Sequence, residues 1–156
     1  MLVAAAASRQ PVYGSDMDNT SPKVRSAVMG RIRSRHTKPE IAVRRYLHGA
    51  GHRFRLHRTD LPGKPDLVFP ARKVAVFVHG CFWHQHGCRL SHVPTSRLDY
   101  WEPKLAGNRQ RDAIACRALE RLGWRVLVIW ECETRDLSRL QHLSATIRSI
   151  SPQVSL

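Results

Sequence analysis

The sequence predicts an α/β protein in which helices cover both faces of a short mixed sheet. A chain of 156 residues with 42% hydrophobic content has the size and apolar content of one domain with one core. Short strand-like runs occupy its middle, and amphipathic helical segments stand before and after them. Elements in this order favour three layers, helix, sheet and helix, and no internal repeat suggests another architecture.

We expect the first 20 residues to form a disordered tail, because they show neither helical nor strand periodicity. Met17 in this tail is a second candidate, beside Met1, for the start of translation. A first helix is expected over residues 21–35, where Ser21 and Pro22 are typical of a helix start. Its apolar residues are spaced four apart and share one face: Val24, Val28 and Ile32.

A second helix is expected to begin after Thr37, with Pro39 in its first turn, and to end near Gly49 or Gly51. This register places Glu40 at its beginning. The apolar residues of the helix are Ile41, Val43, Tyr46 and Leu47.

Strand-like runs follow the second helix. Residues 66–69 and 73–78 are predicted to form a hairpin, with residues 70–72 as its turn. The more polar run 52–57 is expected at an edge of the sheet. Residues 125–130 are rich in β-branched side chains and are predicted to be a core strand.

Two helices complete the predicted fold. The first spans residues 105–122 and ends at Gly123. Its expected apolar stripe consists of Ile114, Ala115, Ala118, Leu119 and Leu122. The second spans residues 137–150 and closes the chain.

The charge balance points to an anionic partner. Lys and Arg number 26 against 12 Asp and Glu, a formal net charge of +14, which makes nucleic acid the first candidate. A ribosomal or histone-like protein would share this charge, but four Trp and clustered Cys and His are unusual for one. No apolar run is long enough to span a membrane, so we expect a cytosolic protein with reduced cysteines. Reduced cysteines favour a metal site over disulfides.

Residues 79–88 contain three His and two Cys. Cys81, His86 and Cys88 offer three ligands for zinc, and Cys132, which follows the last predicted strand, offers a fourth. A closed site of three Cys and one His has no open position, so this zinc would be structural. The alternative is that these cysteines are merely packed or exposed, as we expect for Cys116, a core thiol on the long helix.

Asp66 opens one predicted strand and His79 ends its hairpin partner, so the two side chains can meet at one sheet edge. An Asp there, with a nearby backbone carbonyl, can hold magnesium. His84 is not needed for zinc and can deprotonate an attacking water, with Asp112 orienting it from the long helix. The alternative is a strand-initiating Asp beside solvated histidines.

Residues 22–137 resemble the very short patch repair endonucleases. The resemblance is carried by Leu-Pro-Gly-Lys-Pro-Asp at 61–66, His-Gly-Cys-Phe-Trp-His at 79–84, Gly-Trp-Arg-Val at 123–126 and Trp-Glu-Cys at 130–132. It implies a variant of the restriction-endonuclease fold. It also implies a magnesium-dependent nick in duplex DNA on the 5′ side of the thymine in a T:G mismatch, which arises from deaminated 5-methylcytosine.

The resemblance also implies residue roles in catalysis. Asp66 would bind magnesium together with the backbone carbonyl of Val78, His79 and His84 would assist hydrolysis, and Glu40 would support the water shell of the metal. Position 78 is a Thr in the best-known pattern. The Val found here keeps the carbonyl, so we expect metal binding to survive.

For DNA, the resemblance implies an aromatic wedge, a residue entering from the opposite groove and two contacts to the mispaired bases. The aromatic wedge would consist of Phe82, Trp83 and Trp101. Met29 would enter from the opposite groove, and Lys104 and Asn108 would contact the mispaired bases. Unstacking by an apolar wedge costs a few kcal/mol and is easiest where pairing is already faulty. Without the resemblance, each aromatic would be interpreted as a core residue.

Two alternatives remain open at this point. One is a restriction-like nuclease of other specificity, and the other is a non-catalytic, zinc-organised DNA-binding protein, which has no need for Asp66. We expect a monomer, since a single asymmetric mismatch needs no symmetric dimer, and repair proteins that collect the nicked product are expected partners.

Overall fold

The computed structural model describes residues 35–95 and 97–153. A four-stranded mixed sheet lies at its centre, in the order β1 (Arg55–Leu56), β2 (Leu67–Phe69), β3 (Val74–His79) and β4 (Arg125–Trp130). β2 runs antiparallel to both of its neighbours, β1 and β3, and β4 runs parallel to β3. The predicted hairpin is confirmed, with a 3-10 turn at Pro70–Arg72 between its strands.

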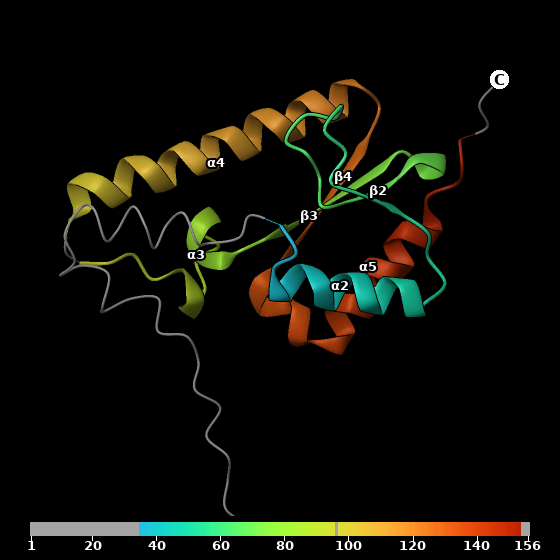
Figure 1. Cartoon of the computed structure of the whole chain (residues 1–156), viewed down its shortest axis with the longest axis horizontal. Coiled ribbons are helices and arrows are strands. Elements are labelled where there is room, and N and C mark those ends of the chain that lie inside the picture. The colour runs from blue at the N-terminus through green and yellow to red at the C-terminus, as the bar shows by residue number, and fades with distance from the viewer. Residues whose placement is uncertain (1–34, 96, 154–156) are drawn as a thin grey trace, which may run out of the picture.

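Helices cover both faces of this sheet (Figure 1). α2 (Lys38–Gly49) and α5 (Leu137–Ser149) pack on one face, and α4 (Leu98–Arg121) packs on the other. A one-turn helix, α3 (Cys81–His84), follows β3 directly. The predicted α/β arrangement of a mixed sheet flanked by helices is confirmed.

The core consists of two clusters because β2 and β3 are buried on both faces. Alternate residues of a strand point to opposite faces. Val74 and Val76 therefore join the cluster under α2 and α5, whereas Ala75 and Phe77 join the cluster under α4. The sheet is thus held from both sides, which fixes the end of β3 where the polar residues lie.

The predicted second helix is confirmed as α2. Thr37 caps it by accepting a hydrogen bond from the Glu40 N–H at 3.4 Å, and a proline stands in the first turn. Val43 and Leu47 are fully buried and anchor the helix on the sheet. Glu40 is also buried, with 1% of its surface exposed. Burial of a carboxylate is costly without partners, and Glu40 has them: the His36 N–H donates to its Oε2 at 2.7 Å, and Arg44 lies 3.3 Å from its Oε1.

The long helix differs from the prediction in its start and its face. α4 begins at Leu98 rather than at residue 105, because the buried Trp101 anchors the added turns to the rest of the protein despite a proline within them. Ile114 is 51% exposed and Leu122 is 55% exposed, so the predicted apolar stripe is wrong at both positions. Leu119 is buried, and with about 3.6 residues per turn Ile114 points away from that side.

β4 is an edge strand among the described residues, not the core strand that was predicted. Only Ile129 is buried there, because no further strand covers its outer side. The predicted edge strand is confirmed as β1, although it spans residues 55–56 rather than 52–57. α5 ends at Ser149, close to the predicted end of the last helix.

The predicted tail, nearly all of the first predicted helix, Met17 and Met29 lie outside the described residues. None of the described helices is long and apolar enough to cross a membrane.

Candidate active site and cysteine-histidine cluster

Asp66 stands directly before β2, at the end of a loop packed against α4. Gly63 in this loop has a φ of +72°, and a side chain there would meet the Ala115 Cβ at 2.6 Å. Pro65 is fully buried. Asp66 Oδ2 accepts a hydrogen bond of 2.7 Å from the Val78 N–H. The loop therefore delivers the carboxylate to the end of β3, within reach of the backbone at position 78.

Burial raises the pKa of Asp66 to about 6; the hydrogen bond from Val78 lowers it, and the nearby charge of Glu40 raises it. Two carboxylates in a poorly solvated region repel each other, and a cation between or beside them relieves that repulsion. This arrangement suits a hard divalent cation, which takes oxygen ligands.

His79, at the end of β3, and His84, at the end of α3, stack face to face, with ring centroids 3.9 Å apart. His84 Nδ1 lies 2.5 Å from Asp112 Oδ2, which reaches across from α4. Burial lowers the pKa of His79 to about 4; the charge of His84 lowers it further, and Asp112 opposes this shift. His79 is thus neutral at neutral pH. The Asp112 contact fixes the ring orientation of His84 and leaves its Nε2 as the nitrogen that can act on a substrate.

These groups lie at one end of β3. The contact that joins Asp66 to this end is with the backbone of Val78, the residue before His79. A carboxylate that can hold a cation therefore lies close to a pair of imidazoles that can move a proton, although the three side chains come from three different segments of the chain. Both kinds of group can assist hydrolysis of a phosphodiester.

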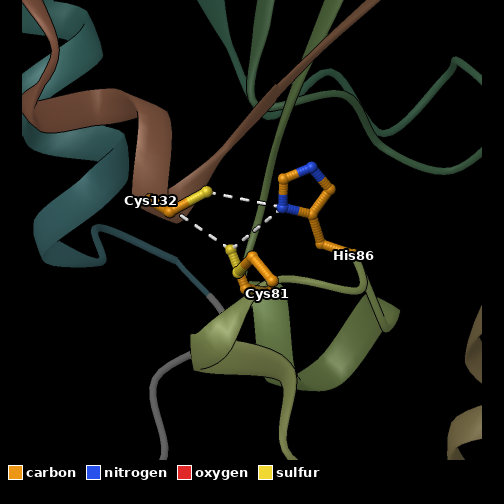
Figure 2. Close-up of side chains that lie close together, drawn as sticks. Cys81, His86 and Cys132 are labelled. Atoms are coloured by element: carbon orange, nitrogen blue, oxygen red, sulfur yellow. Dashed lines mark hydrogen bonds between the residues drawn. The ribbon is translucent and has the colours of Figure 1, made fainter.

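A second group of side chains, the cysteine-histidine cluster, consists of Cys81, His86, Cys88 and Cys132. One ligand atom from each of these residues lies within 4.8 Å of all the others. Figure 2 shows Cys81, His86 and Cys132 pointing toward one another. Cys132 is distant in sequence but follows β4, as Cys81 follows β3, and the two strands are parallel neighbours. Residues after both strands therefore meet at the same sheet edge.

The spacing in this cluster fits a tetrahedral metal ion. Bonds of about 2.3 Å to sulfur and about 2.0 Å to nitrogen place neighbouring ligand atoms roughly 3.5 Å to 3.8 Å apart. His86 Nδ1 lies 3.8 Å from Cys81 Sγ and 3.4 Å from Cys132 Sγ. The Cys132 N–H also donates to Cys81 Sγ at 3.4 Å. The cluster is therefore a candidate site for a divalent metal ion.

The thiols of the cluster differ in acidity. Burial raises the pKa of Cys81 to about 12. Burial also raises the pKa of Cys88, but hydrogen bonds from the Leu90 N–H, from His86 and from the other thiols bring it down to about 7. Deprotonation of all the thiols therefore requires a cation among them, as a bound metal provides. Cys116 lies apart from the cluster and packs against the core under α4, as predicted for it.

The aromatic residues Phe82 and Trp83 on α3 meet Trp101 on α4. Ring centroids are 4.9 Å apart for Phe82 and Trp83, and 5.4 Å apart for Phe82 and Trp101. Trp101 has only 1% of its surface exposed and is a core residue, whereas Phe82 and Trp83 are half-buried. Asn108 donates a hydrogen bond of 3.0 Å to the Trp83 carbonyl, and Lys104 is exposed on α4. This hydrogen bond links α3, which carries Phe82 and Trp83, to α4.

One group near the site has no sequence signature. His57, which follows β1, places its Nε2 3.0 Å from Glu40 Oε1, and His36 lies beside both. His36 and Glu40 are four residues apart, and the His36 N–H donates a hydrogen bond of 2.7 Å to Glu40 Oε2. No local spacing joins His57 to them, because His57 reaches Glu40 only through the packing of the sheet edge against the start of α2. Sequence reasoning missed this group.

Comparisons with known proteins extend this picture. Residues 17–90 match the family described as DNA mismatch endonuclease Vsr. The type II nicking enzyme V.XorIIP of Xanthomonas oryzae pv. oryzae is 55% identical, over 85% of this chain and 96% of its own. The DNA mismatch endonuclease Vsr of Escherichia coli is 40% identical over 80% of each chain. The type II nicking enzyme V.NmeAIP of Neisseria meningitidis is 40% identical, over 83% of this chain and 94% of its own.

Taken with the fold and the site, these similarities place the protein among the DNA endonucleases. More narrowly, the chain belongs to the Vsr family of DNA mismatch endonucleases, which confirms the resemblance found in the sequence.

Proposed function

We propose that this DNA endonuclease nicks one strand of duplex DNA on the 5′ side of the thymine in a T:G mismatch. Such mismatches arise from deaminated 5-methylcytosine, and the nick would initiate very short patch repair. The observation that carries the proposal is the meeting of Asp66 and the stacked pair His79 and His84 at one end of β3. The Escherichia coli relative is named as a mismatch endonuclease, and other relatives are named as nicking enzymes.

Asp66 and the backbone carbonyl of Val78 would hold a magnesium ion, and Glu40 would bind its water shell. The proposed ligands are oxygen atoms, as magnesium requires. When bound, magnesium neutralises charge on the scissile phosphate and makes a coordinated water more acidic. With a pKa of about 6, Asp66 is mostly ionised at neutral pH even before a cation binds.

His84 is the proposed general base. Its Nδ1 contact with Asp112 sets the tautomer and ring orientation, so that Nε2 can take a proton from the attacking water. Asp112 is a positioning residue in this scheme. His79 is neutral and stacked on His84. It can therefore donate a hydrogen bond to the phosphate, and it does not repel the positive charge that His84 acquires when it takes the proton.

We further propose that Cys81, His86, Cys88 and Cys132 hold a structural zinc ion. Three thiols and one imidazole suit zinc and exclude magnesium, and four protein ligands leave no open position. Cys81 is the first residue of α3 and Cys132 follows β4. The cluster would thereby fix the helix that carries Phe82, Trp83 and His84.

Phe82 and Trp83 are the proposed wedge that enters the base stack at the mismatch, with Met29 from the opposite groove. Trp101 is buried and packs against Phe82, so we propose that it supports the wedge and does not itself enter the base stack. Lys104 is exposed and is a proposed base contact. Asn108 has the same proposed role and would exchange its bond to the Trp83 carbonyl for a base.

The proposed unit of function is a single domain over residues 21–156 with a restriction-endonuclease-like core. We propose that it acts as a monomer in the bacterial cytosol, and that repair proteins then collect the nicked DNA. Its high positive charge supports DNA as the partner.

A nicking assay with labelled duplexes tests this function. Duplexes that differ only in carrying T:G or T:A are incubated with the enzyme and magnesium, and we expect cleavage of the T:G strand 5′ of the thymine. Equal cutting of both duplexes would support the restriction-like alternative of other specificity. Asp66→Asn should abolish cleavage while DNA binding persists. Binding without cleavage by the unaltered protein would support the non-catalytic alternative.

A further inference from the structure

His36, Glu40 and His57 form a third group of metal-binding side chains among the described residues. One ligand atom from each lies within 4.8 Å of the others. Glu40 is 1% exposed, and His57 Nε2 lies 3.0 Å from Glu40 Oε1. The two atoms are not aligned for a hydrogen bond, so His57 Nε2 is a buried nitrogen without a hydrogen-bond partner. Glu40 Oε2 accepts from the His36 N–H at 2.7 Å, so Oε1 is the carboxylate oxygen that faces His57 Nε2, and these two atoms can share a cation.

The donor set indicates the kind of cation. Two imidazole nitrogens and one carboxylate suit divalent first-row transition metals, whereas magnesium prefers oxygen ligands alone. Two neighbouring ligands at about 2.1 Å from a six-coordinate ion lie about 3.0 Å apart, which is the observed separation of His57 Nε2 and Glu40 Oε1.

We propose that His36, Glu40 and His57 bind a divalent first-row transition-metal ion, at a site distinct from the cysteine-histidine cluster and from the magnesium ligands. Three protein ligands leave the remaining positions to water. The site contains residues from the start of α2 and from the turn after β1, so it forms only in the folded chain.

Arg44 is the cation that a metal ion would displace. Its Nη1 lies 2.8 Å from His36 Nδ1 and 3.3 Å from Glu40 Oε1. The Arg44 side chain is 26% exposed and can turn into solvent. The guanidinium and a metal ion therefore compete for the same two residues. A bound ion would also withdraw Glu40 from the water shell of magnesium and slow nicking, and this consequence alone rests on the proposed function.

Cobalt binding tests the site directly. Protein reconstituted with zinc at the cysteine-histidine cluster is dialysed against Co²⁺ in excess Mg²⁺, which occupies the proposed oxygen-ligand site at Asp66, and retained cobalt is measured together with the visible spectrum. We expect one additional cobalt per chain, with d–d bands but without the charge-transfer band of thiolate ligands. His36→Gln and His57→Gln should each weaken this binding by about tenfold or more, because loss of a ligand costs at least as much as loss of a group that orients one. His48→Gln, at an exposed histidine on α2, is the matched control and should bind as the unaltered protein does.

Arg44→Gln should change cobalt affinity in the opposite direction. This test does not require the histidine variants to fold. Removal of the competing cation should tighten cobalt binding by about fivefold or more. The proposal is overturned if the double variant His36→Gln, His57→Gln retains as much cobalt as the unaltered protein, or if Arg44→Gln does not tighten binding. Full nicking by Glu40→Gln would contradict the proposed function of Glu40, while the cobalt measurements would still decide the metal site.

Discussion

Asp112 offers a way to separate orientation of the base from metal binding. Its Oδ2 lies 2.5 Å from Nδ1 of the proposed general base His84, the ring nitrogen that does not face the substrate in the proposed scheme. Asp112→Asn should lower single-turnover nicking of T:G duplex by about a hundredfold or more, because His84 loses the partner that sets its tautomer. The substitution keeps the side-chain shape, so thermal stability should change little. An unchanged nicking rate would show that His84 needs no such partner.

Trp83 and Trp101 differ in burial, which makes them a matched pair. Trp83→Ala should weaken binding to T:G duplex roughly ten- to a hundredfold, since stacking contributes about 1 to 3 kcal/mol per base. The preference for T:G over T:A should shrink, with little loss of stability. Trp101→Ala should instead cost about 3 to 5 kcal/mol of folding free energy, because Trp101 is fully buried.

Thermal unfolding measured beside affinity for matched and mismatched duplexes distinguishes these two outcomes. If Trp83→Ala melts as low as Trp101→Ala and discriminates normally, Trp83 is a core residue and the proposed wedge is wrong.

The cysteine-histidine cluster joins two elements, α3 and the 3-10 turn Glu131–Arg135 after β4. We expect one zinc per chain in unchelated protein, retained without magnesium. Cys88→Ser and Cys132→Ser should each lose zinc, melt at lower temperature and lose activity, because metal binding is coupled to folding. Cys116→Ser lies outside the cluster and should keep its zinc. Metal analysis that finds no zinc in the unaltered protein would contradict the assignment.

His52 joins the loop after α2 to α5, through a hydrogen bond of 2.8 Å between its Nε2 and Ser144 Oγ. Burial lowers the pKa of His52, and the charges of Arg148 and Arg72 lower it further. The unfolded chain therefore takes up this proton near pH 6.5, before the folded chain does. The stability that neutral His52 contributes is present above that pH and is lost as the pH falls below it.

Chemical denaturation at pH 7 and pH 5 measures this effect. The unaltered protein should lose more unfolding free energy on acidification than His52→Gln, whose side chain does not titrate. The exposed His92 serves as a control, since His92→Gln should leave the difference unchanged. Equal losses in all three proteins would remove His52 as a source of the pH dependence.

The whole molecule carries a formal charge of +14, which acts on any duplex regardless of sequence. Affinity for T:A duplex should fall about a hundredfold or more between 50 and 200 mM salt, because phosphate contacts release counterions. The ratio of T:G to T:A affinity should change much less, since the wedge and base contacts are not ionic. Anisotropy titrations over this salt range measure both, and a ratio that falls in parallel with affinity would assign the discrimination to charge.

Local signals in the sequence determined much of the fold. α2 was predicted closely because its cap, its proline and its apolar spacing are local signals, and α5 because its helical segment is contiguous in the sequence. The hairpin of β2 and β3 was predicted for the same reason, as its strands and turn are contiguous. The motifs around Asp66 and His79 determined the family.

Only the tertiary structure decided features that depend on packing between distant segments. β4 lies at an edge because no further described strand pairs with it, which a β-branched sequence cannot reveal. α4 begins early because Trp101 is buried. The cysteine-histidine cluster closes because β4 runs parallel to β3, and Glu40 meets His57 because the turn after β1 packs on the start of α2. Residue types determined which ligands were available, and the folding of the chain determined which of them share a site.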